Sequence, residues 1–99
     1  MAAYLVAQIT IHDRERYALY EAGFMDVFQQ YNGKLLSVDE NPDTLEGEWA
    51  CTRTVLIEFP TKTDAQAWYH SNDYQNLAKH RFAASVGNAV MLNGLDEQI

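Results

Sequence analysis

The sequence contains little cysteine and little positive charge, and each shortage excludes functions. Its one cysteine, Cys51, cannot form a disulfide within the chain or supply a zinc site built from several thiolates. Seven Lys and Arg stand against fourteen Asp and Glu, giving a net charge of −7. Nucleic-acid binding requires a basic stripe to meet the phosphates, but the cations are scattered. We therefore expect no nucleic-acid partner and no attraction to anionic lipid, and we interpret Cys51 as a passive thiol.

Long apolar runs and cofactor motifs are also missing. No stretch approaches the roughly 18 apolar residues that a membrane-spanning helix needs. The opening MAAYLVAQITIHD has no basic segment and turns polar at once, which is typical of a strand and not of a signal peptide. There is no Gly-rich phosphate loop and no Ser-His-Asp order. We expect a cytoplasmic protein that needs neither a cofactor nor a membrane.

The residues that are present favour one small globular domain. The chain is 47% hydrophobic and 12% aromatic, and its 99 residues predict a single domain over 1–99. By surface-area scaling, folding a chain of this size removes about 65% of its extended surface from water. One core is possible on that figure without disulfides, but so small a domain gains stability from a partner copy.

The first third of the chain predicts a strand and then a helix. Residues 3–11 alternate, with apolar Leu5, Ala7 and Ile9 on one side and a mixed set on the other. Asp13 is expected to cap the helix. Its apolar stripe has helical spacing and consists of Tyr17, Tyr20, Phe24, Val27, Phe28 and Tyr31. Asn32-Gly33 is expected to end it, with Gly33 in the left-handed conformation.

The rest predicts two strands, an interrupted helix and a last strand. Residues 34–40 and 53–59 are the strands, and the nearly continuous apolar run of the second places it centrally in a sheet. Thr61 or Thr63 is expected to cap the next helix, which buries Ala65, Trp68 and Tyr69. Residues 71–83 restart the helix, and residues 86–94 form the fourth strand. One face of the restarted helix carries Tyr74, Leu77, Ala78, Arg81 and Phe82.

This order predicts an α+β fold of the ferredoxin-like βαββαβ type, a four-stranded antiparallel sheet with the helices on one face. The other face would be bare. It would carry Tyr4, Val6, Gln8, Leu56 and Glu58. Because contiguous exposed apolar area usually marks an interface, we expect a two-fold homodimer that pairs the bare faces.

Four segments resemble the domain of unknown function 1330 family (DUF1330). They are LEGEW at 45–49, VLIEFP at 55–60, AWYHSNDYQNL at 67–77 and HRFAA at 80–84. The resemblance covers essentially the whole chain. It departs at Asn72, where the family usually has proline, a residue suited to the first helical position, so the change touches the helix start and no chemistry. The resemblance implies a dimeric α/β barrel fold and no established activity.

The segment LEGEW precedes the most apolar strand. Gly47 is expected to take a positive φ in a turn. Glu46 and Trp49 are either a solvated carboxylate and a packed ring, or parts of a loop that closes one mouth of a ligand pocket between sheet and helices. We predict that Trp49 folds inward over the helix-facing side of the sheet, near Trp68 or the tyrosines of the first helix, because exposure would leave a large apolar area in water.

Glu58 and Arg81 are the candidate catalytic residues. Glu58 lies between Ile57 and Phe59 in a central strand, where a carboxylate needs a partner or neutralises. It is either bonded to Gln8 or an arginine, or a general base with a raised pKa. Arg81 falls on the inner stripe of the last helix. It either pairs with a carboxylate or presents its fork to an acidic ligand, and we predict the bond with Glu46 or Glu58.

The aromatic and histidine residues are less specific. Trp68, Tyr17 and Tyr20 are common core residues, although buried tyrosine hydroxyls seek partners, and they are the candidate lining of a ligand cleft. His12, His70 and His80 match no compact ligand spacing, so no metal site is expected.

Two functions stay open at this point. In the first, a cleft between sheet and helices binds or transforms a small apolar or aromatic molecule without a cofactor. The resemblance supports it only by analogy, because dimeric α/β barrels include monooxygenases and isomerases of this kind. In the second, the chain is a non-catalytic dimeric module whose polar core residues are structural. A void on which the candidate residues converge would favour the first.

Overall fold

The computed structural model describes residues 1–95, so the last four residues of the domain expected over 1–99 lie outside the description. The elements follow in the order β1 (Ala3–Ile11), α1 (Arg14–Phe28), β2 (Lys34–Asp39), β3 (Arg53–Phe59), α2 (Lys62–Tyr69), α3 (Asn72–Ala84) and β4 (Ser85–Asn93). The strands form one antiparallel sheet in the order β2-β3-β1-β4. This arrangement confirms the predicted ferredoxin-like α+β fold with β3 inside the sheet.

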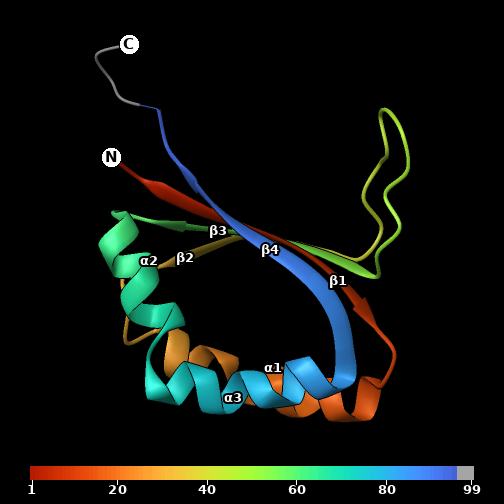
Figure 1. Cartoon of the computed structure of the whole chain (residues 1–99), viewed down its shortest axis with the longest axis horizontal. Helices are drawn as coiled ribbons and strands as arrows, with labels where there is room; N and C mark the ends of the chain where they lie inside the picture. Colours follow the sequence, from red (N-terminus) through yellow and green to blue (C-terminus); the bar gives the residue numbers. More distant parts are fainter. Residues whose placement is uncertain (96–99) are drawn as a thin grey trace.

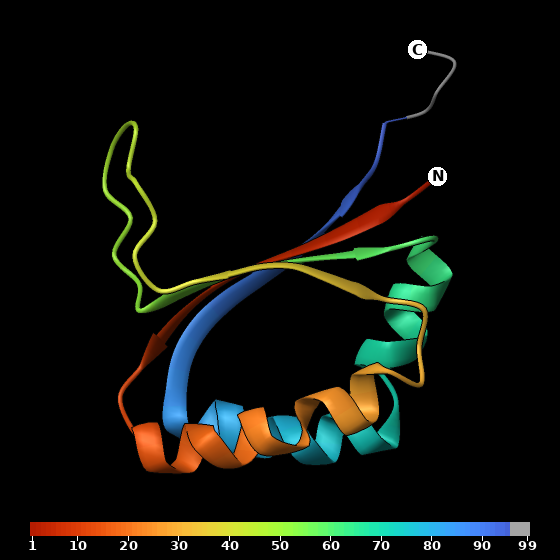
Figure 2. The ribbon, with the colours of Figure 1, turned by 180° about the vertical axis from the view of Figure 1, so that it is seen from behind.

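The three helices lie on one side of the sheet (Figure 1). Helices α1 and α3 run side by side beneath it, and α2 descends from the end of β3 toward α3 at one end of the intervening space (Figure 2). The connection between β2 and β3, residues 40–52, rises on the opposite side of the sheet in both views. None of the helices among the described residues combines the length and apolar character that a membrane crossing requires.

The alternation of β1 sets which residues face the helices. Ala3, Leu5, Ala7 and Ile9 are buried, while the residues between them are half-buried. A shift of one residue would exchange the two faces of a strand, so this pattern fixes the register. Antiparallel pairing continues it sideways, since Leu5 lies opposite Ile57 of β3 and Met91 of β4. The expected bare face is therefore present, and β4 adds three exposed apolar residues to it, Val86, Val90 and Leu92.

Aromatic rings fill the core at the α2 end. Trp68 is 1% exposed, and its ring centroid lies 5.6 Å from those of both Phe28 and Phe59 and 4.2 Å from that of Tyr74. Burial of one large aromatic side chain contributes about 2–3 kcal/mol. The predicted burial of Trp68 is confirmed, whereas Phe82, expected on the same helix face as Tyr74 and Ala78, differs from them because it is 52% exposed.

Side-chain caps start the helices where the sequence indicates. Asp13 accepts a hydrogen bond from the Arg16 amide at the start of α1, and Ser71 accepts one from the Tyr74 amide at the start of α3. Thr61, and not Thr63, caps α2 by accepting from the Asp64 amide. A cap of this kind stabilises a helix by about 1 kcal/mol.

The end of α1 differs from the prediction. The helix ends at Phe28, and Gly33 does not have a positive φ. A Cβ atom at Gly33 would lie 2.5 Å from Cζ of Phe28 and 2.6 Å from Cε1 of Phe59. Glycine is required there because two aromatic rings approach the backbone. Gly47 does have a positive φ, 73°, which confirms its predicted place in a turn.

Candidate functional site

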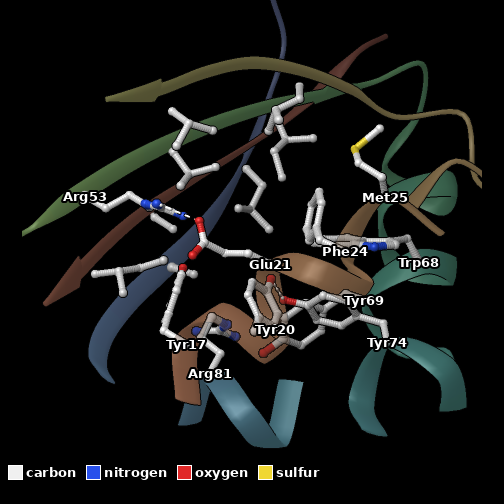
Figure 3. A pocket seen from close by; sticks show the side chains of 18 residues that line it. Tyr17, Tyr20, Glu21, Phe24, Met25, Arg53, Trp68, Tyr69, Tyr74 and Arg81 are labelled. Atoms are coloured by element: carbon white, nitrogen blue, oxygen red, sulfur yellow. Dashed lines mark hydrogen bonds and ion pairs between the residues drawn. The ribbon is translucent and has the colours of Figure 1, made fainter. Parts of the chain in front are cut away.

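A cavity of about 220 Å³ lies between the sheet and helices α1 and α3. The sheet contributes small and aliphatic side chains to its lining, among them Leu5, Ala7, Val55, Ile57 and Ala89. The helices contribute aromatic rings and a few polar groups. Four of the candidate catalytic or ligand-binding residues predicted from the sequence line the cavity together: Tyr17, Tyr20, Trp68 and Arg81. The close-up view shows their side chains arranged around one space (Figure 3).

Arg53, the first residue of β3, marks one end of the cavity. Its Nη2 lies 2.9 Å from Oε2 of Glu21 on α1 and 3.6 Å from Oε2 of Glu40, and its Cζ lies 5.1 Å from the Tyr17 ring centroid. Glu40 also bonds Arg14 of α1 at 2.8 Å. This chain of ion pairs joins helix α1 to the sheet beside the cavity. Two carboxylates thus compensate the charge of Arg53.

The opposite end of the cavity is apolar. Trp68, Phe24 and Met25 lie there, away from the Arg53–Glu21 pair (Figure 3). The Trp68 indole Nε1 is buried and has no hydrogen-bond partner among residues 1–95, and the same holds for Nε of Arg53. An unpaired buried donor usually costs about 1–3 kcal/mol. The surroundings of the cavity are therefore short of acceptors.

A third polar group lies between the two helices. The hydroxyls of Tyr20 on α1 and Tyr74 on α3 are 2.8 Å apart, and both side chains are buried. Burial, followed by the contact with Tyr74, raises the pKa of Tyr20 well above its ordinary value. Burial also raises the pKa of Tyr17, although Arg53 opposes the change. Tyr17 and Tyr20 therefore stay protonated near neutral pH and act there as hydrogen-bond donors or acceptors, not as anions.

Arg81 lies beside this tyrosine pair. Its Cζ is 5.8 Å from the Tyr20 ring centroid and 4.7 Å from that of Phe82. Burial would lower the pKa of Arg81, but Tyr74 and Tyr20 outweigh it and raise the pKa, so the guanidinium stays charged. Within the described residues Arg81 forms no salt bridge. The predicted bond to Glu46 or Glu58 is therefore wrong, because neither carboxylate lies on the helix side of the sheet near α3.

Trp49 and Glu46 lie away from the cavity, in the loop of residues 40–52. Trp49 is 42% exposed, and its Nε1 donates to Oγ1 of Thr54 at 2.8 Å. Thr54 pairs with Gln8 on the bare face of the sheet. Trp49 and Glu46 line a separate hollow within the loop. The prediction that the indole folds inward near Trp68 is wrong, since the Thr54 hydroxyl holds it on the other side.

Glu58 also faces away from the cavity. It lies on the bare face, opposite Tyr4 of β1 and Lys34 of β2, and it is half-buried. Hydrogen bonding to Glu58, and then its charge, raises the pKa of Tyr4. Because a general base must reach the ligand, this position removes Glu58 from any chemistry in the cavity. Its cross-strand neighbours are Tyr4 and Lys34, and among residues 1–95 it forms no salt bridge with an arginine and no bond with Gln8, so that expectation is wrong.

The sequence reasoning missed Arg53 and Glu21. Arg53 has the same parity as Val55, Ile57 and Phe59, so the alternation of β3 could have placed it on the helix-facing side. Glu21 lies one helical turn after Tyr17, and that spacing places it on the inner face of α1. Among residues 1–95, no three His, Cys, Asp or Glu side chains gather in a way that could hold a metal ion.

Comparisons with solved structures agree with the fold. A protein of unknown function from Rhodopseudomonas palustris superimposes with a TM-score of 0.80 at 18% identity, over 96% of this chain and 83% of that one. A dimeric ferredoxin-like protein of unknown function from Jannaschia sp. CCS1 gives 0.79 at 13% identity, over 95% and 100%. SnoaB, a cofactor-independent oxygenase from Streptomyces nogalater, gives 0.67 at 11% identity, over 96% and 94%. At identities this low the likeness shows the fold alone.

The family is shown by the sequence itself. No curated protein matches this chain. The family model described as a domain of unknown function (DUF1330), however, matches residues 2–95, which include every strand and helix described above. The chain belongs to the DUF1330 family.

Proposed function

We propose that the protein is a homodimer that binds or transforms a small aromatic or apolar molecule, without a cofactor, in the cavity between its sheet and helices. The observation that carries this proposal is the cavity itself. It has an apolar lining interrupted by a few polar groups, and ligand sites are usually built in this way. A module with a purely structural core would be expected to fill that space with side chains.

The volume limits the size of the ligand. An apolar cavity of roughly 150 Å³ can bind benzene, whereas pockets for drug-sized ligands measure roughly 300–1,000 Å³. The cavity here, about 220 Å³, lies between these values. It suits a single ring with one or two small substituents.

The groups that line the cavity can position a ligand and donate hydrogen bonds to it. They are phenols, guanidinium groups and the Glu21 carboxylate. One structural neighbour, SnoaB, is a cofactor-independent oxygenase, which supports chemistry without a cofactor on this fold only as an analogy. The cytoplasmic location expected from the sequence stays a prediction.

The dimer in this proposal is supported by the bare face of the sheet. Val90 is 56% exposed and lies opposite Val6 of β1, in a row that continues to Leu56 of β3. The neighbour from Jannaschia is a dimeric ferredoxin-like protein, which agrees with pairing through this fold. Burial of the row in a second copy would remove its apolar area from water.

Sedimentation velocity at micromolar concentration tests the dimer. We expect a species of twice 11.3 kDa. Val90→Glu should produce the monomer, because it places a charge in the centre of the interface. Leu19→Glu is the matched control, since Leu19 is similarly exposed at 54% but lies on α1, and it should leave the dimer intact. A monomeric wild type would overturn the dimer.

Ligand binding is tested by thermal shift with single-ring compounds, neutral and charged. Ala7→Leu adds three carbons that project into the cavity and should abolish the shift. Ala18→Leu makes the same change on the exposed side of α1 and should preserve it. A ligand that stabilises all three proteins equally binds elsewhere. If no compound stabilises the wild type, the proposed function is wrong.

A further inference from the structure

The two arginines of the cavity differ in how their charges are compensated. Arg53 lies within 4 Å of two carboxylates, those of Glu21 at 2.9 Å and Glu40 at 3.6 Å. Arg81 has no carboxylate partner among residues 1–95, and its guanidinium lies against the Tyr20 and Phe82 rings. Although the chain has a net charge of −7, this cavity-lining cation has no counter-ion within the part of the chain that the structure describes. Arg81 is half-buried, and a charge that is partly withdrawn from water is stabilised by an opposite charge that bonds to it.

The neighbouring pair of Tyr20 and Tyr74 has one hydroxyl donor that their mutual hydrogen bond does not use. Tyr20 and Tyr74 have two hydroxyl protons between them, and the 2.8 Å bond uses one. Arg81 only donates hydrogen bonds, so it cannot accept the second proton. One tyrosine hydroxyl and the guanidinium therefore share the same need, an acceptor. Tyr20, Tyr74 and Arg81 all line the cavity, and a ligand placed there could supply it.

We propose that the ligand is a single-ring aromatic carboxylate, whose carboxylate accepts hydrogen bonds from Arg81 and from the Tyr20–Tyr74 pair. Its ring would then occupy the apolar part of the cavity, beside Phe24 and Trp68 (Figure 3). A carboxylate has acceptors only, and its two oxygens match the two neighbouring donors of a guanidinium. This inference rests on the proposed function, because it identifies the ligand class of the same cavity.

Neutral rings of the same shape would be recognised less well. Benzamide has the outline of benzoate, but it has one acceptor in place of two and no charge. A hydrogen bond to a charged group contributes more than one between neutral groups, which corresponds to about tenfold or more in affinity. The difference between these two compounds therefore isolates the contribution of Arg81 from that of the apolar cavity.

The experiment is titration calorimetry of benzoate and benzamide at neutral pH with the wild type, Arg81→Met and Arg16→Met. Arg16 lies on the exposed surface of α1 and bonds His80, so its variant loses the same charge outside the cavity. We expect the wild type and Arg16→Met to bind benzoate about tenfold or more tightly than benzamide. Arg81→Met should remove the preference while it still binds benzamide. Tyr74→Phe should weaken benzoate alone.

The outcomes separate this inference from the proposed function. Equal affinities of the wild type for the two compounds would overturn the carboxylate proposal and leave a cavity for neutral rings. A preference that survives in Arg81→Met would also overturn it, because the anion would then bind another cation. Absence of binding by either compound to the wild type would overturn both. If Arg81→Met does not fold, Tyr74→Phe supplies the second test, and an unchanged preference for benzoate in that variant would overturn the proposal.

Discussion

The hydrogen bond between Tyr20 and Tyr74 gives the sharpest prediction for stability without a ligand. The two oxygens are 2.8 Å apart, and the side chains are 7% and 2% exposed. Tyr20→Phe or Tyr74→Phe leaves one hydroxyl buried without this partner, which costs about 1–3 kcal/mol of unfolding free energy. Tyr74→Phe should be the more costly, because Tyr74 is the first of the groups that raise the pKa of Arg81 and so favours its charged form.

The loss of unfolding free energy in the double variant should be smaller than the sum of the losses in the two single variants. Replacement of both partners by apolar groups of the same shape is nearly neutral for the pair itself. We therefore expect the double variant to lose no more stability than the worse single variant, with a coupling energy of about 1–2 kcal/mol. Urea unfolding at one fixed protein concentration measures all four proteins, and a fixed concentration is needed because a dimer links stability to concentration. Additive losses, or two neutral single variants, would refute the buried bond.

Three further predictions concern other sites. Gly33→Ala should lower the unfolding free energy by about 1–3 kcal/mol in urea, because its Cβ would overlap two aromatic rings; an unchanged midpoint would contradict this packing. The hydrogen bond from Arg14 is the main reason why the pKa of Glu40 is lowered. The Glu40 carboxylate therefore stabilises the fold above its ordinary pKa of 4.5, and this stabilisation is lost as the pH falls through the lowered pKa. Glu40→Gln should therefore be less stable than wild type at neutral pH and converge with it in acid; a constant difference would contradict the ion pair. Trp49→Phe loses an exposed hydrogen bond to Thr54, outside the cavity, so calorimetry should show a benzoate affinity within about twofold of that of the wild type. A larger loss of affinity would indicate that the loop of residues 40–52 contributes to the binding site.

Periodicity made most of the fold predictable. The alternation of residues 3–11 identified both the strand and its buried face, because successive side chains of a strand point to opposite faces and only one face is apolar when the strand is half-buried. Ser71 indicated the break between α2 and α3, because its hydroxyl can cap a new helix. The end of α1 was not predictable from Gly33. The need for glycine there comes from Phe28 and Phe59, and the contact with Phe59 depends on the folded chain.

The candidate site was predictable only in part, for a related reason. Tyr17, Tyr20, Trp68 and Arg81 lie on inner helical faces, and helical spacing indicates such faces. The direction of Trp49 is set by a single bond to Thr54 within an irregular loop, which has no periodicity to interpret. The partner of Arg81 was predicted from the charges of Glu46 and Glu58, but both lie away from the cavity. Charge alone does not specify which residues meet.

The most direct measurement for the central claim is a crystal structure of the protein soaked with 4-bromobenzoate, with data recorded at the bromine absorption edge. The anomalous signal locates the bromine atom independently of the fitted chain. The account predicts one bromine per chain inside the cavity, at the Phe24 and Trp68 end, with the carboxylate oxygens within hydrogen-bond distance of Arg81. Bromine in the loop hollow near Trp49 or on the bare face of the sheet, with the cavity empty, would contradict it.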